Sequence, residues 1–186
     1  MKQLIEQKRL LIVDDEPEIL EIIQSFMSEE KIECICCKGI HKAENIILNE
    51  TIHGVFCDIQ MPAGSGTDLL RNIRCKGMST PFTFITAFYN TNNFLHAIQL
   101  GAFDFIIKPF QINHLIDVAH RMLELGKAIS IMEKNIQNPD FGSNELEELQ
   151  KNFPKLFKMM AHNNLKSHPQ VNPKDGQFLN EFNFED

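Results

Sequence analysis

Short apolar runs alternate with amphipathic segments along the first two thirds of the chain. The run at residues 54–58 is too short for a helix and is flanked by glycine and proline, so it predicts a buried strand. Between the runs, apolar residues recur every three or four positions, which is the spacing of a helix with one apolar face. The predicted strands cover residues 10–13, 32–37, 54–58, 82–86 and 103–107.

A helix is predicted after each of these strands. Pro17 stands near the start of the first helix, a position that proline favours. Five alternations of strand and helix predict an α/β fold, in which a parallel sheet carries helices on both faces. The predicted helices are centred on residues 19–27, 40–47, 66–76, 94–100 and 112–123. The apolar face predicted for the first helix consists of Ile19, Ile22, Ile23, Phe26 and Met27.

Polar side chains follow four of the predicted strands. Asp14 and Asp15 follow the first, Asp58 ends the third, and Thr86 and Lys108 stand at the ends of the fourth and fifth. The carboxyl ends of parallel strands meet at one edge of a sheet, where open α/β proteins place their chemistry. Neighbouring carboxylates cannot all stay ionised without compensation, and a hard divalent cation, most simply Mg²⁺, would supply it. One carboxylate could then attack a phosphoryl group.

Further residues complete a pattern that runs from the end of the first predicted strand to the end of the fifth. Its parts are Asp14-Asp15, Asp58, Met61-Pro62, Gly66, Thr86-Ala87, Gly101-Ala102 and Lys108-Pro109. In order and spacing this pattern resembles the receiver domain of bacterial two-component response regulators. The resemblance implies a flavodoxin-like, doubly wound five-stranded parallel sheet of order 2-1-3-4-5. It predicts a receiver domain at residues 9–126 and a C-terminal extension at 127–186.

The resemblance also implies a metal and phosphorylation site. Asp58 would be the phospho-acceptor. Asp15, Asp58 and the backbone carbonyl of Gln60 would bind Mg²⁺ directly, and Mn²⁺ could replace it. Asp14 would reach the metal through water. Gln60 would also flank the phosphoryl group, where it could tune the lifetime of the phosphorylated state.

The resemblance also implies which residues bind the phosphoryl group and respond to it. Thr86 and Lys108 would bind it, and the small Ala87 would leave its oxygens accessible. Phe105 would turn inward as Thr86 moves, and Lys108-Pro109 would be a cis peptide bond. Phe88 could partly screen the site from attacking water and so tune the lifetime of the phosphorylated state; alternatively, it is a surface aromatic that packs against its loop.

The cysteines are predicted to lie in the core rather than to form a metal site. Cys34 and Cys36 are expected on one face of their strand, with Ile35 and Cys37 on the other. A zinc site usually needs four ligands in separated pairs, so buried apolar roles are favoured. Cys57 is likewise predicted to be core. The odd total of five argues against a disulfide framework and favours a cytoplasmic location. Gly64-Ser65-Gly66 is interpreted as the turn into the third helix.

The net charge and the lengths of the apolar runs limit the kinds of binding partner that we expect. A formal net charge of -7 and a pI of about 5.5 argue against a generic nucleic-acid surface. No apolar run has the length of a membrane span, and the N-terminus lacks the apolar segment of a signal peptide. Membrane association is therefore not expected.

The extension at 127–186 is predicted to be partly helical or disordered, with no recognised output domain. It lacks a helix-turn-helix pattern with a basic recognition helix, so DNA binding is not expected. A sharper hypothesis is that apolar residues of the extension dock on the signalling face of this protein or on a partner. The two candidate groups are Leu156, Phe157 and Met160, and Phe178, Phe182 and Phe184.

These observations predict a response regulator that takes a phosphoryl group from a histidine kinase or histidine phosphotransfer protein. It would signal through a downstream protein partner and catalyse only its own phosphorylation and dephosphorylation. The resemblance also suggests a homodimer through the fourth helix, the fifth strand and the last helix. Three alternatives stay open: a transcriptional regulator with an unrecognised output tail, an aspartyl-phosphate phosphatase, and a pseudo-receiver that serves only as a scaffold.

Overall fold

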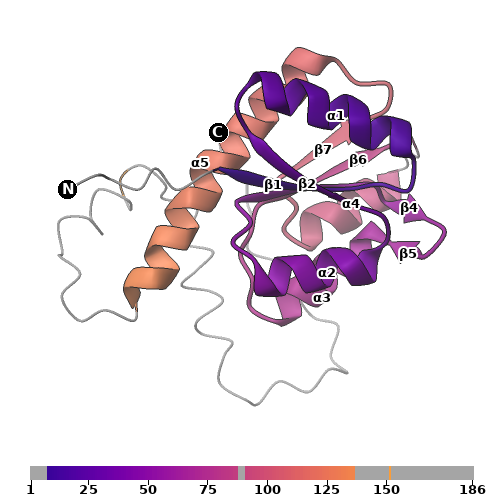
Figure 1. Ribbon diagram of the computed structural model, residues 1–186. Coiled ribbons are helices and arrows are strands. Elements are labelled where there is room, and N and C mark those ends of the chain that lie inside the picture. Colours follow the sequence, from indigo (N-terminus) through magenta and orange to yellow (C-terminus); the bar gives the residue numbers. More distant parts are fainter. Residues whose placement is uncertain (1–7, 88–90, 137–150, 152–186) are drawn as a thin grey trace, which may run out of the picture.

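The computed structural model describes residues 8–87, 91–136 and 151. Its main sheet has five parallel strands in the order β2-β1-β3-β6-β7, which confirms the predicted order 2-1-3-4-5 once two very short strands are set aside. Figure 1 shows the twisted sheet between two layers of helices. The strands are β1 (Arg9–Val13), β2 (Glu33–Cys37), β3 (Gly54–Cys57), β6 (Phe82–Thr86) and β7 (Asp104–Ile107).

The helices cover both faces of the sheet, as the alternating pattern predicted. Helices α1 and α5 pack on one face, and α2, α3 and α4 pack on the other (Figure 1). Two separate apolar clusters form, one on each face, because strand side chains alternate between the faces. The helices are α1 (Pro17–Glu29), α2 (Ile40–Asn49), α3 (Gly66–Cys75), α4 (Thr91–Gln99) and α5 (Ile112–Ile136).

The cysteines of β2 confirm the predicted alternation. Cys34 and Cys36 pack with the cluster under α1 and α5, whereas Ile35 and Cys37 pack with the opposite cluster. Cys57 is also buried in the core. Burial raises the pKa of Cys37 to about 11. These thiols therefore behave as small apolar side chains.

The inward face of α1 differs from the prediction. Leu20, Ile23 and Met27 are buried, whereas Ile22 is 44% exposed. The helix carries more apolar residues than one stripe can hold, so their spacing alone does not fix its rotation. The prediction that Ile22 lies in the core is therefore wrong, and Leu20 is buried instead.

The segment after β3 has more structure than the predicted turn. Strands β4 (Gln60–Met61) and β5 (Gly64–Ser65) form a small antiparallel pair. The Ser65 hydroxyl then accepts a hydrogen bond from the Thr67 N–H at 3.2 Å and caps the start of α3. The hairpin and the cap together fix the path of the chain from Asp58 into α3.

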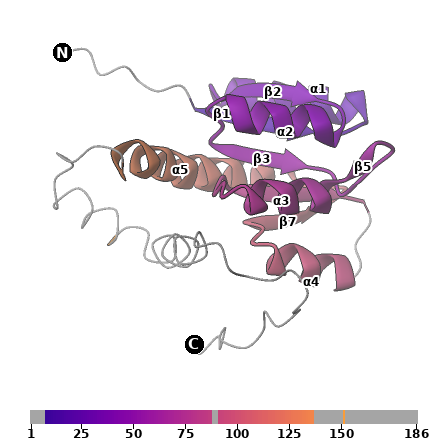
Figure 2. The same cartoon turned by 90° about the horizontal axis from the view of Figure 1, so that it is seen from below.

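Helix α5 continues without a break across the predicted boundary between residues 126 and 127. Figure 2 shows its distal half running past the end of the sheet at which the strands begin. Gly126 allows this crossing, because a Cβ atom there would lie 1.8 Å from the carbonyl oxygen of His53. Within the described part of the chain, no helix is both long and apolar enough to span a membrane.

Candidate functional site

The ends of β1 and β3 bring two buried carboxylates together. Asp14 and Asp58 directly follow these neighbouring strands. Their backbones continue the pairing, because the Asp58 N–H donates to the Val13 carbonyl at 2.9 Å and the Asp14 N–H donates to the Cys37 carbonyl at 3.3 Å. Both side chains are more than 90% buried. The predicted convergence of acids at this edge is therefore present.

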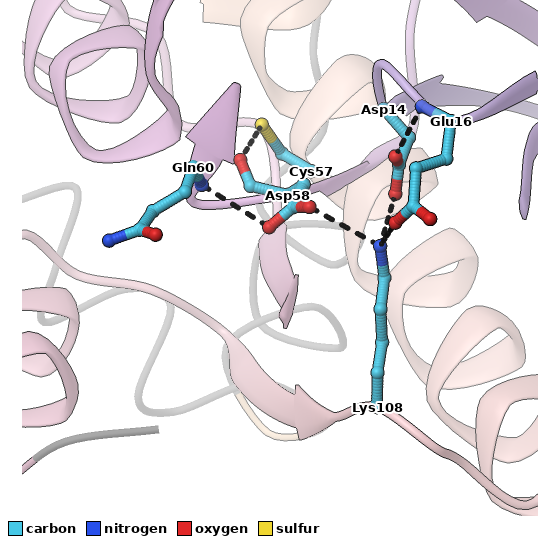
Figure 3. Close-up of polar contacts among 6 residues, drawn as sticks. All are labelled: Asp14, Glu16, Cys57, Asp58, Gln60 and Lys108. Atoms are coloured by element: carbon cyan, nitrogen blue, oxygen red, sulfur yellow. Dashed lines mark hydrogen bonds and ion pairs between the residues drawn. The ribbon is translucent and has the colours of Figure 1, made fainter. Parts of the chain in front are cut away.

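Lys108 reaches into this group from the end of β7, as Figure 3 shows. Its Nζ lies 2.8 Å from Asp14 Oδ2, 3.2 Å from Asp58 Oδ2 and 3.1 Å from Glu16 Oε1. The Lys108 side chain is only 10% exposed, whereas that of Glu16 is 56% exposed. One ammonium group thus partly neutralises three carboxylates, and only one of these faces open solvent.

Burial and charge act against each other at this site. Burial raises the pKa of Asp14, and hydrogen bonds from Lys108 and from the Glu16 N–H offset this only in part. Burial alone would lower the pKa of Lys108, but its hydrogen bonds to Asp14 and Glu16 and the nearby charges outweigh that effect and raise the pKa. Lys108 therefore stays positively charged at neutral pH.

Glu16 is a member of the site that the sequence did not identify. Its backbone N–H donates to Asp14 Oδ1 at 2.9 Å, which turns the chain so that its side chain meets Lys108. Asp15, the predicted direct metal ligand, is half-buried and lies outside the group formed by Asp14, Glu16 and Asp58. The acidic run before Pro17 was visible in the sequence, but a loop has no side-chain period that shows which acid turns inward.

The backbone around Asp58 is held from both sides. The Gln60 N–H donates to Asp58 Oδ1 at 3.2 Å, and the Cys57 thiol donates to the Asp58 carbonyl at 3.0 Å. Gly66 lies so close that a Cβ atom would come within 2.2 Å of that carbonyl oxygen. The side chain of Gln60 is exposed, so it borders the site without filling it.

The predicted phosphate-reading residues lie on neighbouring strands. Thr86 is fully buried at the end of β6, and its carbonyl accepts a hydrogen bond from the Lys108 N–H at 2.8 Å. Ala87 is exposed. The Phe105 ring is half-buried, with its centroid 5.6 Å from that of Phe94 in α4. The Lys108-Pro109 peptide bond is cis, as predicted. Phe88 lies outside the described residues.

The donor set suits a hard divalent cation. Asp14, Glu16 and Asp58 each offer an oxygen atom, and these atoms lie within 4.8 Å of one another. Carboxylate oxygens are the ligands that Mg²⁺ and Mn²⁺ prefer. Because Asp14 and Asp58 are buried, a bound cation would add the positive charge that Lys108 supplies only in part. The residues present therefore fit the predicted metal.

Comparisons with known proteins agree with this geometry. A family model described as the response regulator receiver domain matches residues 10–120. Response regulator protein PilR of Pseudomonas aeruginosa is 30% identical over 119 residues, which are 64% of this chain and 27% of PilR. Transcriptional regulatory protein DltR of Streptococcus agalactiae is 34% identical over 143 residues, 75% of this chain and 63% of DltR. The chain thus spans less than two thirds of each of these curated relatives.

Solved structures give the same result. The non-phosphorylated HemR receiver domain from Leptospira biflexa has a TM-score of 0.60 and 30% identity, covering 64% of this chain and 96% of that one. A CheY-like receiver domain protein from Methanospirillum hungatei has a TM-score of 0.60 and 26% identity, covering 65% and 97%. From the sheet order, the acidic edge and these matches together, this chain belongs to the response regulator receiver domain family.

Proposed function

We propose that Asp58 accepts a phosphoryl group from a phosphohistidine of a histidine kinase or histidine phosphotransfer protein. The observation that carries this proposal is the placement of Asp58 beside Asp14, with both carboxylates held by Lys108 Nζ at 3.2 and 2.8 Å. An oxygen of Asp58 attacks phosphorus, the N–P bond of the donor breaks, and the released imidazole nitrogen takes up a proton. Catalysis is then positioning and charge neutralisation.

Lys108 is placed to hold the new charge. Its ammonium group already contacts Asp58, so a short movement brings it to an oxygen of the transferred phosphoryl group. A divalent cation, when bound by Asp58 with Asp14 and Glu16, supplies further neutralisation of the phosphoryl oxygens. The family resemblance also assigns Asp15 and the Gln60 carbonyl to the metal. Mg²⁺ is the expected metal, and Mn²⁺ is a substitute.

Residues of β6 and β7 would respond to the new charge on Asp58. Thr86 ends β6 beside the site, and Phe105 lies in β7 between Phe84 and Phe94. We propose that Thr86 moves toward the phosphoryl group and that Phe105 turns inward. That change would alter the surface made by α4, β7 and α5, since it biases an equilibrium between two packings.

That surface already exposes large apolar side chains. Leu95 and Ile98 of α4 are 50% and 52% exposed, and Ile107 of β7 is 45% exposed. Such residues suit contact with a protein, so we propose that output occurs here, through a downstream protein or a second copy of the chain. Sedimentation with and without beryllofluoride, a phosphoryl mimic, distinguishes these two partners.

DltR, which is named a transcriptional regulatory protein, favours a second candidate function, because its match extends over 143 residues. Under that alternative, output would be DNA binding rather than protein contact. Retention of the beryllofluoride-treated full chain on random genomic DNA fragments at moderate salt would favour it. Loss of binding only at high salt is the expected mark of phosphate contacts.

The central proposal is tested by incubating the full chain with Mg²⁺ and acetyl phosphate and measuring its intact mass. We expect one added phosphoryl group, lost on mild alkaline treatment as an acyl phosphate should be. Asp58→Asn should abolish the adduct. Asp68→Asn, which changes an exposed acid of α3, should leave it unchanged. An adduct that persists in Asp58→Asn contradicts the assignment.

A further inference from the structure

The distal half of α5 is covered by something other than the two core clusters. Ala128 and Ile129 are each 4% exposed, and Met132 is 2% exposed. These values match those of the sheet core, yet none of the three belongs to either cluster that the described residues form. This part of α5 also extends past the end of the sheet (Figure 2). Ile129 lines a cavity with residues 47–52, so it is the burial of Ala128 and Met132 that requires a further segment of protein.

Helical spacing shows which side of α5 is covered. Ala128 and Met132 follow Arg121 by seven and eleven residues, so all three lie on one side of the helix. Arg121 contacts β7, with Nη2 at 3.2 Å from Asp104 and its guanidinium 5.6 Å from the centre of the Phe103 ring. The covered stripe therefore continues the side of α5 that faces β7, next to the proposed output surface.

The neighbouring side of α5 has a different environment. Ile129, Ser130 and Glu133 line a cavity of about 390 Å³, whose opposite wall is residues 47–52 with Met78 and Thr80. Gly126 packs against the His53 backbone on that same side. The sheet and its loops therefore account for this side, whereas the stripe of Ala128 and Met132 needs another occupant.

We propose that residues 143–153 of this same chain form a helix that folds back along α5 and covers the stripe. The chain continues from residue 137 to residue 186, and this segment is the first amphipathic stretch that it reaches. Leu146, Leu149 and Phe153 stand at i, i+3 and i+7, which is one apolar face. Ser143 is a suitable N-cap, and glutamates follow it in the first turn.

The exposure of Lys151 agrees with docking of this apolar face. It is the described residue of this segment, and it is helical and exposed. On a helix it lies opposite the face of Leu146, Leu149 and Phe153, so an exposed Lys151 is what docking of that face requires. Residues 137–142 include Asn138-Pro139 and Gly142 and leave a connection of ordinary length for two antiparallel helices.

The consequence is a helical hairpin attached to the receiver. It would place residues 154–186, with their apolar and acidic side chains, beside the α4-β7-α5 surface. This inference does not depend on phosphorylation, so it can fail or succeed separately from the proposed function. The docking segment proposed here differs from the two groups named from the sequence, which both lie after residue 153.

Hydrogen exchange of the full chain, followed by mass spectrometry, tests the proposal. Leu149→Asp should speed exchange in peptides from residues 127–136 by about tenfold or more, because these amides lose their cover. The matched control Lys151→Asp, on the exposed side of the same segment, should change it little. Peptides from residues 112–123 should be unaffected in both variants, which shows that the receiver remains folded.

The other occupants give different results. If residues 1–7 cover the stripe, Ile5→Asp speeds exchange at 127–136 and Leu149→Asp does not. If a second copy covers it, protection falls on dilution and the chain sediments as a dimer. Either result overturns the proposal, as does unchanged exchange in Leu149→Asp. A second measurement uses Met132→Cys with Leu149→Cys in a Cys75→Ser chain, where oxidation should give an intrachain disulfide in the monomer.

Discussion

The two edges of the sheet satisfy their polar groups in different ways. At the carboxyl edge, side chains pair with side chains: Lys108 bridges Asp14, Glu16 and Asp58. At the opposite edge, Arg9 forms more exposed ion pairs with Glu33 and Glu50, and the buried cation there, Arg74, pairs with the backbone. Arg74 donates hydrogen bonds to the carbonyls of residues 78, 80 and 101 at 2.8, 3.0 and 3.2 Å.

This difference separates what can rearrange from what is fixed. An ammonium group shared among three carboxylates can exchange partners when a metal or a phosphoryl group arrives, since no strand must move. A guanidinium that satisfies three carbonyls from two loops can leave only if those loops come apart. The carboxyl edge is thus suited to a reversible reaction, and the other edge to holding α3, β6 and β7 in register.

Lys108→Met should have the largest effect. Removing the ammonium leaves Asp14 and Asp58 buried without their partner, at an expected cost of about 3–5 kcal/mol without metal. Mg²⁺ should stabilise this variant more than the wild type, because the cation no longer competes with Lys108 for the same oxygens. Urea denaturation in EDTA and in Mg²⁺ measures both effects.

The control for this variant is Lys76→Met. Lys76 pairs with Glu44 at 2.7 Å, but its side chain is 48% exposed, so its loss should cost less than about 1 kcal/mol. Equal stabilisation of wild type and Lys108→Met by Mg²⁺ would show that the metal and Lys108 do not share ligands.

Arg74→Met should come next, at about 2–3 kcal/mol, because it leaves backbone carbonyls without donors at the fixed edge. Burial lowers the pKa of Arg74 to about 10, which still leaves it charged at neutral pH. Phosphorylation of the folded protein at Asp58 should continue at the wild-type rate. Urea denaturation and the intact-mass assay measure the two properties.

Arg71→Met is the matched control for Arg74→Met. Arg71 lies one turn earlier on the same helix and pairs with Asp68 at the surface, so little stability should be lost. If Arg74→Met instead slowed phosphorylation without unfolding the protein, the two edges would not have the separate roles that we assign to them.

Gly126→Ala should cost about 1–2 kcal/mol. Alanine favours a helix over glycine by about 1 kcal/mol, but the new Cβ would lie 1.8 Å from the His53 carbonyl oxygen and would push α5 away from β3. Thermal melting measures the change, with the exposed neighbour Lys127→Ala as control. A higher melting temperature for Gly126→Ala would show that this close approach is not tight.

The sheet and most of the site followed from the sequence because their signals are local. An apolar run followed by an acid or a lysine marks both a strand and its carboxyl end, which is how Asp14, Asp58 and Lys108 were found. The place of Glu16 could not be predicted, since the turn that aims it depends on one hydrogen bond to Asp14.

Long-range contacts explain the remaining differences. The three carbonyls that Arg74 binds include that of Gly101, which is 27 residues away, so no spacing in the sequence indicates that role. In the sequence alone, Gly126 would be interpreted as a helix breaker. The structure shows that a glycine is needed there because the backbone of His53 lies so close. In α1, Leu20 and Ile22 are both apolar, and only packing against the sheet decides which one is buried.

The smallest effect is expected from the thiols, and it shows where the reactive zone of the carboxyl edge ends. Cys37 and Cys57 lie beside Asp14 and Asp58 but belong to the core, and burial raises the pKa of both thiols. With a pKa of about 11, Cys37 would be thiolate in only about one molecule in ten thousand at pH 7, even without steric protection. Iodoacetamide should therefore modify the exposed Cys75 first, with no early adduct in Cys75→Ser, as peptide mapping can show. Beryllofluoride should not speed modification of Cys37 or Cys57, because the proposed rearrangement involves the charged side chains, Thr86 and Phe105 and leaves β2 and β3 in place. Faster labelling of either cysteine would mean that the switch opens the core itself.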